Sequence, residues 1–171
     1  MAAITGDFPP GPYTATWNGN SIGLMEGPIR HQQSIIALPV RASLYGQEII
    51  DYILQGTGGV FAAFMLKEWN ANVKAALWPY GSTQGITSQR GQLIGAGALA
   101  KSLVLTAMPL TPAATEGPVT RTYPLAILLP GHTLDYTLGP VERNIPVIMC
   151  ALPESEVIST TTLGTKHFTD T

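Results

Sequence analysis

The segment Gly19 to Gly23 reads GNSIG and fits the G-x-S-x-G pattern, which would make Ser21 the nucleophile of an esterase-type hydrolase. That chemistry needs a strand, a sharp turn and then a helix, because this geometry lifts the serine hydroxyl above a sheet. Here strand-forming residues from Tyr13 to Trp17 lead into Asn18-Gly19, a pair typical of hairpin turns, and a following helix would soon meet Gly27-Pro28. The stretch therefore predicts a β-hairpin, and a Ser21 hydrolase is the weaker alternative.

The remaining chemistry-bearing side chains are scattered along the chain. The histidines lack the spacing of a zinc site, and the carboxylates lack that of paired acid-base catalysis; they are His31, His132, His167, Asp51, Glu68 and Asp135. His132 and Asp135 could join Ser21 in a triad only through folding. Gly95 to Ala100 fits a relaxed dinucleotide fingerprint, but a strand-like segment follows it instead of a phosphate-binding helix. We expect no catalytic residue, no metal and no cofactor.

The composition is unusual in its low charge. Charged residues make up 12% of the chain, hydrophobic residues 45%, and the net charge is −2, whereas about 25% charge is typical of globular proteins. A soluble monomer usually keeps a charged surface, so this chain is expected to cover much of its surface with copies of itself. No basic patch for nucleic acid, secretion signal or membrane span is visible. The single cysteine, Cys150, lies in an apolar run and is expected to be a buried small hydrophobe in a reducing cytoplasm.

The chain contains 18 glycines and 14 prolines, which are expected to form turns between segments rich in strand-forming residues. We expect an N-terminal arm at 1–12, one β domain at 13–153 and a polar tail at 154–171. A stripe of Trp69, Val73 and Leu77 predicts a helix from Glu68 to Trp78. The strand candidates, with a turn expected at Gly56 to Gly59, are Tyr13 to Trp17, Ser21 to Glu26, Ile29 to Arg41, Gln47 to Gln55, Val60 to Leu66, Lys101 to Met108, Thr120 to Leu129, Thr133 to Gly139 and Glu142 to Leu152. The predicted fold class is mainly β: a β-sandwich or partial barrel with one flanking α-helix.

The order of several short motifs resembles the major tail tube protein of long-tailed, non-contractile bacteriophages. These motifs are Tyr13 to Gly19 with Ile22-Gly23 and Glu26-Gly27, Tyr45-Gly46 before an Ile-rich strand, Gly56 to Trp69 running into a helix that ends at Trp78 to Gly81, Arg121 to Pro124, Glu142 to Val147, and Ala151 to Pro153. The resemblance implies a subunit that forms hexameric rings, which complete a larger barrel and stack into a tube around a DNA channel. It implies no enzymatic activity and no cofactor.

The same resemblance implies partners and a location. The partners would be other copies of the chain, the tape measure, terminator and baseplate proteins, and double-stranded DNA that passes without tight binding. The protein would be assembled in the host cytoplasm and would reside in the virion tail. A terminator, baseplate or needle component is the structural alternative, and a monomeric carbohydrate- or receptor-binding β domain is the binding alternative. A binding domain should carry aromatic side chains on loops, whereas Trp17 lies in a strand and Trp69 and Trp78 in the helix.

Candidate surface residues follow from the polar strand positions and from the segments expected to cross between subunits. The lumen-facing candidates are Arg30, Gln32, Ser34, Asp51 and Gln55. The inter-subunit candidates are Phe8, Pro10, Tyr45, Tyr80 and Phe168. Two segments are candidates for a loop that stacks rings: Ala42 to Gln47 and Gly81 to Gly97.

Overall fold

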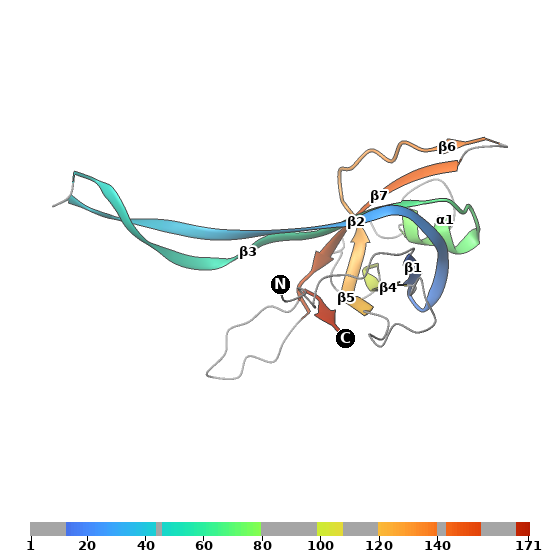
Figure 1. The fold of residues 1–171 in the computed structure, drawn as a ribbon, viewed down its shortest axis with the longest axis horizontal. Coiled ribbons are helices and arrows are strands. Elements are labelled where there is room, and N and C mark those ends of the chain that lie inside the picture. The colour runs from blue at the N-terminus through green and yellow to red at the C-terminus, as the bar shows by residue number, and fades with distance from the viewer. Residues whose placement is uncertain (1–12, 44–45, 80–98, 108–119, 140–142, 155–166) are drawn as a thin grey trace, which may run out of the picture.

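The computed structural model describes residues 13–43, 46–79, 99–107, 120–139, 143–154 and 167–171. A small body carries a long β-hairpin that projects far from it (Figure 1). The elements are β1 Tyr13–Trp17, β2 Asn20–Ala42, β3 Glu48–Leu66, α1 Ala71–Leu77, β4 Lys101–Ala107, β5 Thr120–Leu128, β6 Thr137–Leu138, β7 Arg143–Leu152 and β8 Thr169–Asp170. The prediction of a mainly β fold with one flanking helix is confirmed.

The body is a single antiparallel sheet that closes on itself. Its strand order is β6-β7-β3-β2-β1-β4-β5-β8, and β5 also pairs with β7. That additional pairing aligns Leu125 to Leu128 with Leu152 to Met149, so six strands form a complete circuit. This circuit agrees with the expected partial barrel. A closed circuit also leaves fewer strand edges unpaired than an open sheet does.

The core fills the inside of this circuit through alternation along the strands. On β1, Tyr13, Ala15 and Trp17 are buried while the residues between them are partly exposed, and β4 and β7 show the same period of two. The Trp17 indole Nε1 donates a hydrogen bond of 3.2 Å to the Ala126 carbonyl oxygen on β5. Each fully buried large side chain stabilises the fold by about 1.5–3 kcal/mol. The core therefore links all parts of the barrel.

Helix α1 packs its short apolar face against the barrel. The Asn70 side chain accepts a hydrogen bond of 2.9 Å from the Val73 backbone N–H and caps the first turn. Val73, Ala76 and Leu77 are buried. The helix is shorter than the predicted Glu68 to Trp78, because the cap at Asn70 fixes its start and leaves Trp69 outside it.

Two predicted chain breaks are wrong. Strand β2 runs continuously through Gly27-Pro28, and β3 runs through the expected turn at Gly56 to Gly59. Interruptions of the ladder absorb these residues: the register shifts between Glu26 and Arg30, and Gly58 has no partner opposite β2. Glycine and proline here mark irregular positions within strands and do not end them. The predicted strand from Thr133 to Gly139 is reduced to β6.

The β1–β2 hairpin confirms the prediction from Asn18-Gly19, since both residues have positive φ, 52° and 75°. A register shift follows: Ala15 pairs with Gly23 and Thr16 pairs with Ser21, which leaves Ile22 without a partner. This bulge places Ile22 in the core, where it is fully buried. Gly23 has φ 92°, and a Cβ added to it would lie 2.6 Å from Glu68 Cδ.

Gly23→Ala tests this bulge, with Gly19→Ala as the matched control. Both positions have positive φ, so each alanine should lower the free energy of unfolding by about 1–2 kcal/mol through backbone strain. Only Gly23→Ala also forces a clash with Glu68, because Gly19 faces open space, and it should cost roughly 1–3 kcal/mol more. Urea unfolding followed by tryptophan fluorescence measures both. Glu68→Ala should recover part of the excess in the Gly23→Ala chain, because it removes Glu68 Cδ and Oε2 but keeps the Cβ that lies 2.9 Å from the added atom. Equal losses at the two glycines would contradict the clash.

Candidate assembly interface

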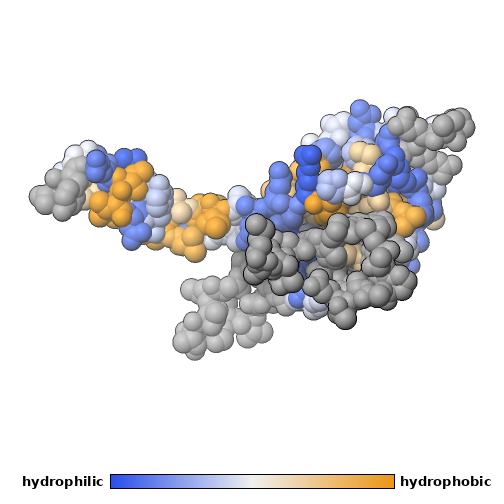
Figure 2. All heavy atoms as spheres, viewed as in Figure 1, coloured by the Kyte–Doolittle hydropathy of each residue, from blue (hydrophilic) through white to orange (hydrophobic). Residues whose placement is uncertain are grey.

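The outer part of the β2–β3 hairpin, named here the projecting ribbon, comprises residues 35–42 and 48–57. It holds eight of the eleven large hydrophobic side chains that are exposed in the described residues. Their exposed fractions range from 43% at Ile49 to 72% at Leu54. Figure 2 shows the resulting apolar patches along the ribbon, well separated from the body. The eight residues are Ile35, Ile36, Leu38, Ile49, Ile50, Tyr52, Ile53 and Leu54.

Both faces of the ribbon are apolar. Directly paired residues of antiparallel strands point to the same face, and successive residues along a strand point to opposite faces. Ala37 pairs with Leu54 on one face, where Ile35 also lies two residues earlier on β2. Leu38 pairs with Ile53 on the other face, together with Ile36. A ribbon that rested one face on a partner would still leave the opposite apolar face in water.

The ribbon's two outer edges are also unpaired within the described residues. β1 pairs with β2 only as far as Leu24, and β7 pairs with β3 only from Val60 onward. An isolated two-stranded hairpin is marginally stable in water, and exposed edges present backbone N–H and C=O groups to any approaching strand. Faces and edges together make this segment suited to burial in a larger assembly.

Charge on the ribbon gathers toward its tip. Residues 35–40 and 52–57 contain no charged side chain, whereas Arg41, Glu48 and Asp51 follow in the outer third. An Arg41 guanidinium N–H donates a 2.9 Å hydrogen bond to the Gln47 carbonyl oxygen across the turn. Asp51 Oδ1 accepts a bond of 2.7 Å from the Tyr52 N–H. Residues 35–40 and 52–57 of the ribbon can therefore be buried without removing a charge from water.

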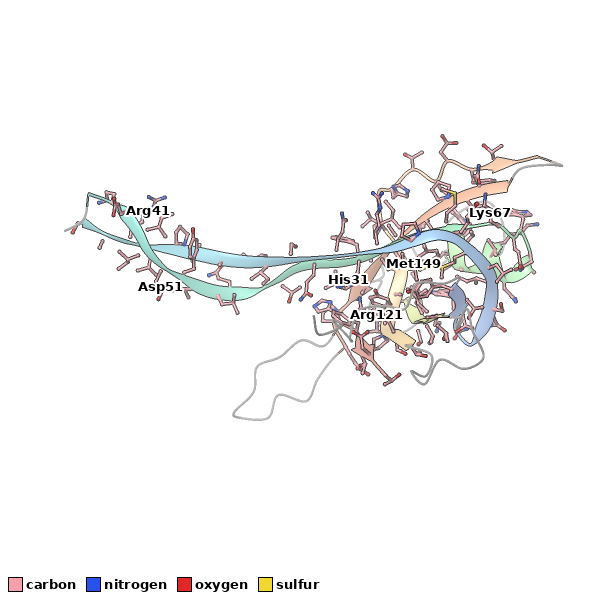
Figure 3. The ribbon with its side chains drawn as sticks, in the orientation of Figure 1. His31, Arg41, Asp51, Lys67, Arg121 and Met149 are labelled. Carbon is pink, nitrogen blue, oxygen red and sulfur yellow. The ribbon has the colours of Figure 1, made fainter. Side chains whose placement is uncertain are left out.

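The lumen-facing candidates do not lie together. Arg30, Gln32 and Ser34 alternate along one face of β2 at the ribbon's root, opposite Ala63, Phe61 and Gly59 of β3, and all three are exposed. His31, between the first two, points the other way and hydrogen-bonds Tyr123 in the core. Asp51 and Gln55 lie farther out on the ribbon (Figure 3). Only the first three form one continuous polar row.

Most inter-subunit candidates fall outside the described residues, namely Phe8, Pro10, Tyr45 and Tyr80, as does the Gly81 to Gly97 loop. The described flanks of the Ala42 to Gln47 loop form the tip of the projecting ribbon. Phe168 packs against its own chain: its ring centroid lies 4.8 Å from that of His31. Strand β8 follows it directly, near the end of the segment predicted as a polar tail.

Ser21 has surroundings unlike those of a hydrolase nucleophile. It is exposed in β2, no helix follows it, and its Oγ accepts a 3.2 Å hydrogen bond from the Gly23 N–H. Two imidazoles are bonded elsewhere, His31 Nδ1 to the Tyr123 hydroxyl at 3.0 Å and His167 Nδ1 to the Ala151 carbonyl at 2.9 Å. Burial raises the pKa of the half-buried Cys150 thiol, which disfavours the reactive thiolate.

The described part of the chain contains no group of three histidine, cysteine or acidic side chains placed to hold a metal ion. It also contains no helix with the length and apolar character of a membrane span.

Sequence reasoning found the strands of the ribbon but missed that they leave the body. The usable signal was present in Ile35-Ile36 and in the run from Ile49 to Leu54, where large apolar residues occupy adjacent positions. A strand with one face in water should alternate, so apolar residues on both faces indicate burial on both. Among the described residues, these side chains remain exposed.

Comparisons with known proteins bear on the fold. No protein-family model matches the chain, and no curated protein matches its sequence. A solved structure, the PVC sheath/tube terminator of an extracellular contractile injection system in its extended state, is similar with a TM-score of 0.53. The match covers 86% of this chain and 94% of that one at 10% sequence identity. At this level of identity, the similarity shows that the two proteins share a fold.

Leu54→Ala and Leu105→Ala should separate ribbon from core in the isolated chain. Leu54 is 72% exposed, so its truncation should change the free energy of unfolding by no more than about 0.5 kcal/mol. Leu105 is fully buried on β4, and its truncation should cost about 2–5 kcal/mol. Chemical denaturation at low protein concentration measures both. A large loss for Leu54→Ala would mean that the ribbon is already packed within one chain.

Proposed function

We propose that this protein is a structural subunit that polymerises as stacked, hexameric rings into the tail tube of a long-tailed, non-contractile phage, the conduit through which DNA enters the host. The single observation that carries the proposal is the projecting ribbon, apolar on both faces and unpaired at both edges. The fold shared with a terminator of a tail-like particle supports it. The low charge of the whole chain has the same explanation, since a subunit covered by its neighbours needs little charge for solubility.

The energetics favour assembly through the ribbon. Its eight hydrophobic side chains are 43% to 72% exposed, so burying what remains of them would contribute roughly 7–14 kcal/mol, about half of the 1.5–3 kcal/mol expected for a fully exposed side chain in each case. Association costs about 4–15 kcal/mol in lost freedom of motion, so a contact that covers only one face leaves little surplus. Covering both faces gives stable contact. In the proposed tube, ribbons lie between subunits and their edges continue into neighbouring sheets, completing a larger barrel in each ring.

In this arrangement the polar row of Arg30, Gln32 and Ser34 faces the channel. It carries one positive charge in a chain of net charge −2, too little to hold a passing DNA duplex by neutralising phosphates. The other partners are the tape measure, terminator and baseplate proteins, and the site of action is the virion tail after assembly in the host cytoplasm. We propose no enzymatic activity and no cofactor.

A tail terminator is the second candidate, because the solved structure that shares the fold is named a sheath/tube terminator. The two roles differ in how far assembly proceeds. A tube subunit binds copies of itself above and below and grows into cylinders, whereas a terminator forms a single ring that caps a tube. Electron microscopy of the purified protein distinguishes cylinders from single rings.

A charge placed on each apolar face should abolish assembly. Leu38→Glu and Leu54→Glu each put a carboxylate into the proposed contact, on opposite faces of the ribbon, and burying an unpaired charge costs several kcal/mol. We expect each variant to remain folded by circular dichroism and to lose cylinders and rings in negative-stain micrographs. Ala71→Glu is the matched control, because it adds the same charge at an exposed position in the first turn of α1.

The control variant should assemble as the unmodified chain does. Loss in only one ribbon variant would limit the contact to one face and contradict burial on both. Assembly unchanged in both would remove the ribbon from the interface and the proposal with it.

Ser21→Ala should leave assembly and stability essentially unchanged. The hydroxyl is exposed, and its contact with the Gly23 N–H is worth about 0.5–1.5 kcal/mol at most. Electron microscopy and a p-nitrophenyl ester assay on both chains provide the measurements. Ester hydrolysis by the unmodified chain that disappears in Ser21→Ala would establish the hydrolase alternative.

A further inference from the structure

The C-terminal strand β8 covers one edge of β5 beside the root of the projecting ribbon. Thr169 and Asp170 pair with Thr122 and Arg121, and Thr120 and Thr171 exchange two backbone hydrogen bonds of 2.7 and 2.9 Å. The Arg121 guanidinium donates to both carboxylate oxygens of Asp170 at 2.5 and 2.6 Å. Strand β8 is thus held on β5 by a short backbone ladder and by one bidentate ion pair.

Phe168, the residue before β8, connects this strand to the root of the ribbon through contact with His31. The two ring centroids lie 4.8 Å apart in an edge-to-face arrangement, and the Arg121 guanidinium carbon lies 4.7 Å from the Phe168 centroid. His31 lies on β2 opposite Ala62, four residues before the ribbon begins. Figure 3 shows His31 and Arg121 close to one another where the hairpin leaves the body. Phe168, directly before β8, therefore contacts His31 at the root of the projecting ribbon.

His31 is held in a site that favours its neutral form. Its Nδ1 lies 3.0 Å from the hydroxyl of Tyr123, itself fully buried, and its Nε2 is the one buried side-chain polar atom without a hydrogen-bond partner in the described residues. Burial and then the positive charge of Arg121 lower the pKa of His31, against the weaker opposing effects of Gln33 and Asp170. A proton on this ring would add a second positive charge beside Arg121 and leave it poorly solvated.

We propose that β8 is a detachable latch on the root of the projecting ribbon, docked while His31 is neutral and released when His31 takes up a proton. Release lets water reach the charged ring. It also exposes the edge of β5 from Thr120 to Thr122 and frees Phe168 for contacts with other chains. The proposal concerns a single chain and does not depend on the assembly that it forms.

The direction of the pH dependence follows from which state binds the proton better. The pKa of docked His31 lies below the ordinary 6.5, so docking is fully favourable above that pH and weakens as the pH falls below it. Asp170 cannot cause this change, because Arg121 lowers the pKa of its carboxyl below 3.8. His167 Nδ1 lies 2.9 Å from the Ala151 carbonyl oxygen, outside the contacts that join Phe168 to His31 and Arg121. The geometry therefore assigns the pH dependence of docking to His31.

Amide hydrogen exchange on the full-length chain tests the latch. The protection factors of Thr120 and Thr171, corrected for intrinsic exchange at each pH, should fall severalfold from pH 7.5 to pH 5 and by no more than about thirtyfold, because pH 5 is only about 1.5 pH units below the ordinary histidine pKa. Amides in the β1–β4 ladder should keep their protection. His31→Gln should remove the pH effect, and His167→Gln should retain it. Asp170→Asn should lower protection at both pH values, and the fold-change between them should stay the same or increase, because Asp170 no longer raises the pKa of His31.

Constant protection of Thr120 and Thr171 across this range overturns the latch, as does an equal loss in His31→Gln. A loss shared by the β1–β4 ladder assigns the effect to unfolding of the whole body and also overturns it. Should His31→Gln not fold, NMR titration of the His31 ring in the unmodified chain decides the matter, and a pKa of 6.5 or above contradicts the proposal. None of these outcomes alters the assembly test with Leu38→Glu and Leu54→Glu.

Discussion

Water contact along the projecting ribbon is the constraint on which the rest of this molecule depends. A hairpin of two strands has two faces and two edges, and in this chain the faces carry Ile, Leu and Tyr side chains while the edges lack partners within the described residues. Among the described residues, the apolar side chains of the body fill the interior of the closed sheet, and both faces of the ribbon remain exposed. The described part of the chain therefore leaves an apolar surface in water, which the proposed assembly would cover.

The closed body and the open ribbon use the same two strands for opposite purposes. Within the body, β2 and β3 pair with β1 and β7, and residues such as Val60 and Leu66 are fully buried. Strand β1 stops pairing at Leu24 of β2, β7 stops pairing at Val60 of β3, and beyond these residues only the hairpin continues. The core holds one end of the hairpin in place. Less conformational entropy is therefore lost when the ribbon makes contacts than would be lost by an unfolded segment.

Local signals in the sequence were sufficient for the fold class and for part of the topology. The pair Asn18-Gly19 specifies its hairpin turn, and alternation along β1 and β4 identifies the core. The closure of β5 onto β7 could not be predicted, because it depends on pairing between strands rather than on composition. Gly56 to Gly59 misled because glycine permits both a turn and a bulged strand, and only the pairing partner decides between them. Of the candidate site, the row at Arg30, Gln32 and Ser34 follows from simple alternation, whereas the two-sided exposure of Ile53 and Leu54 required knowing where the neighbouring strands end.

The register of the ribbon has a geometric consequence for whatever covers it. Gly58, Gln55 and Ile50 are each extra residues on β3, so this strand follows a longer path than β2 over the same span, and such bulges increase the right-handed coiling of a strand pair. Figure 1 shows the two strands winding about each other toward the tip. The apolar surface of the ribbon is therefore twisted along its length and is not a pair of flat faces. A complementary surface must wrap around it, which favours several neighbours that each meet one part of the turn over one flat partner.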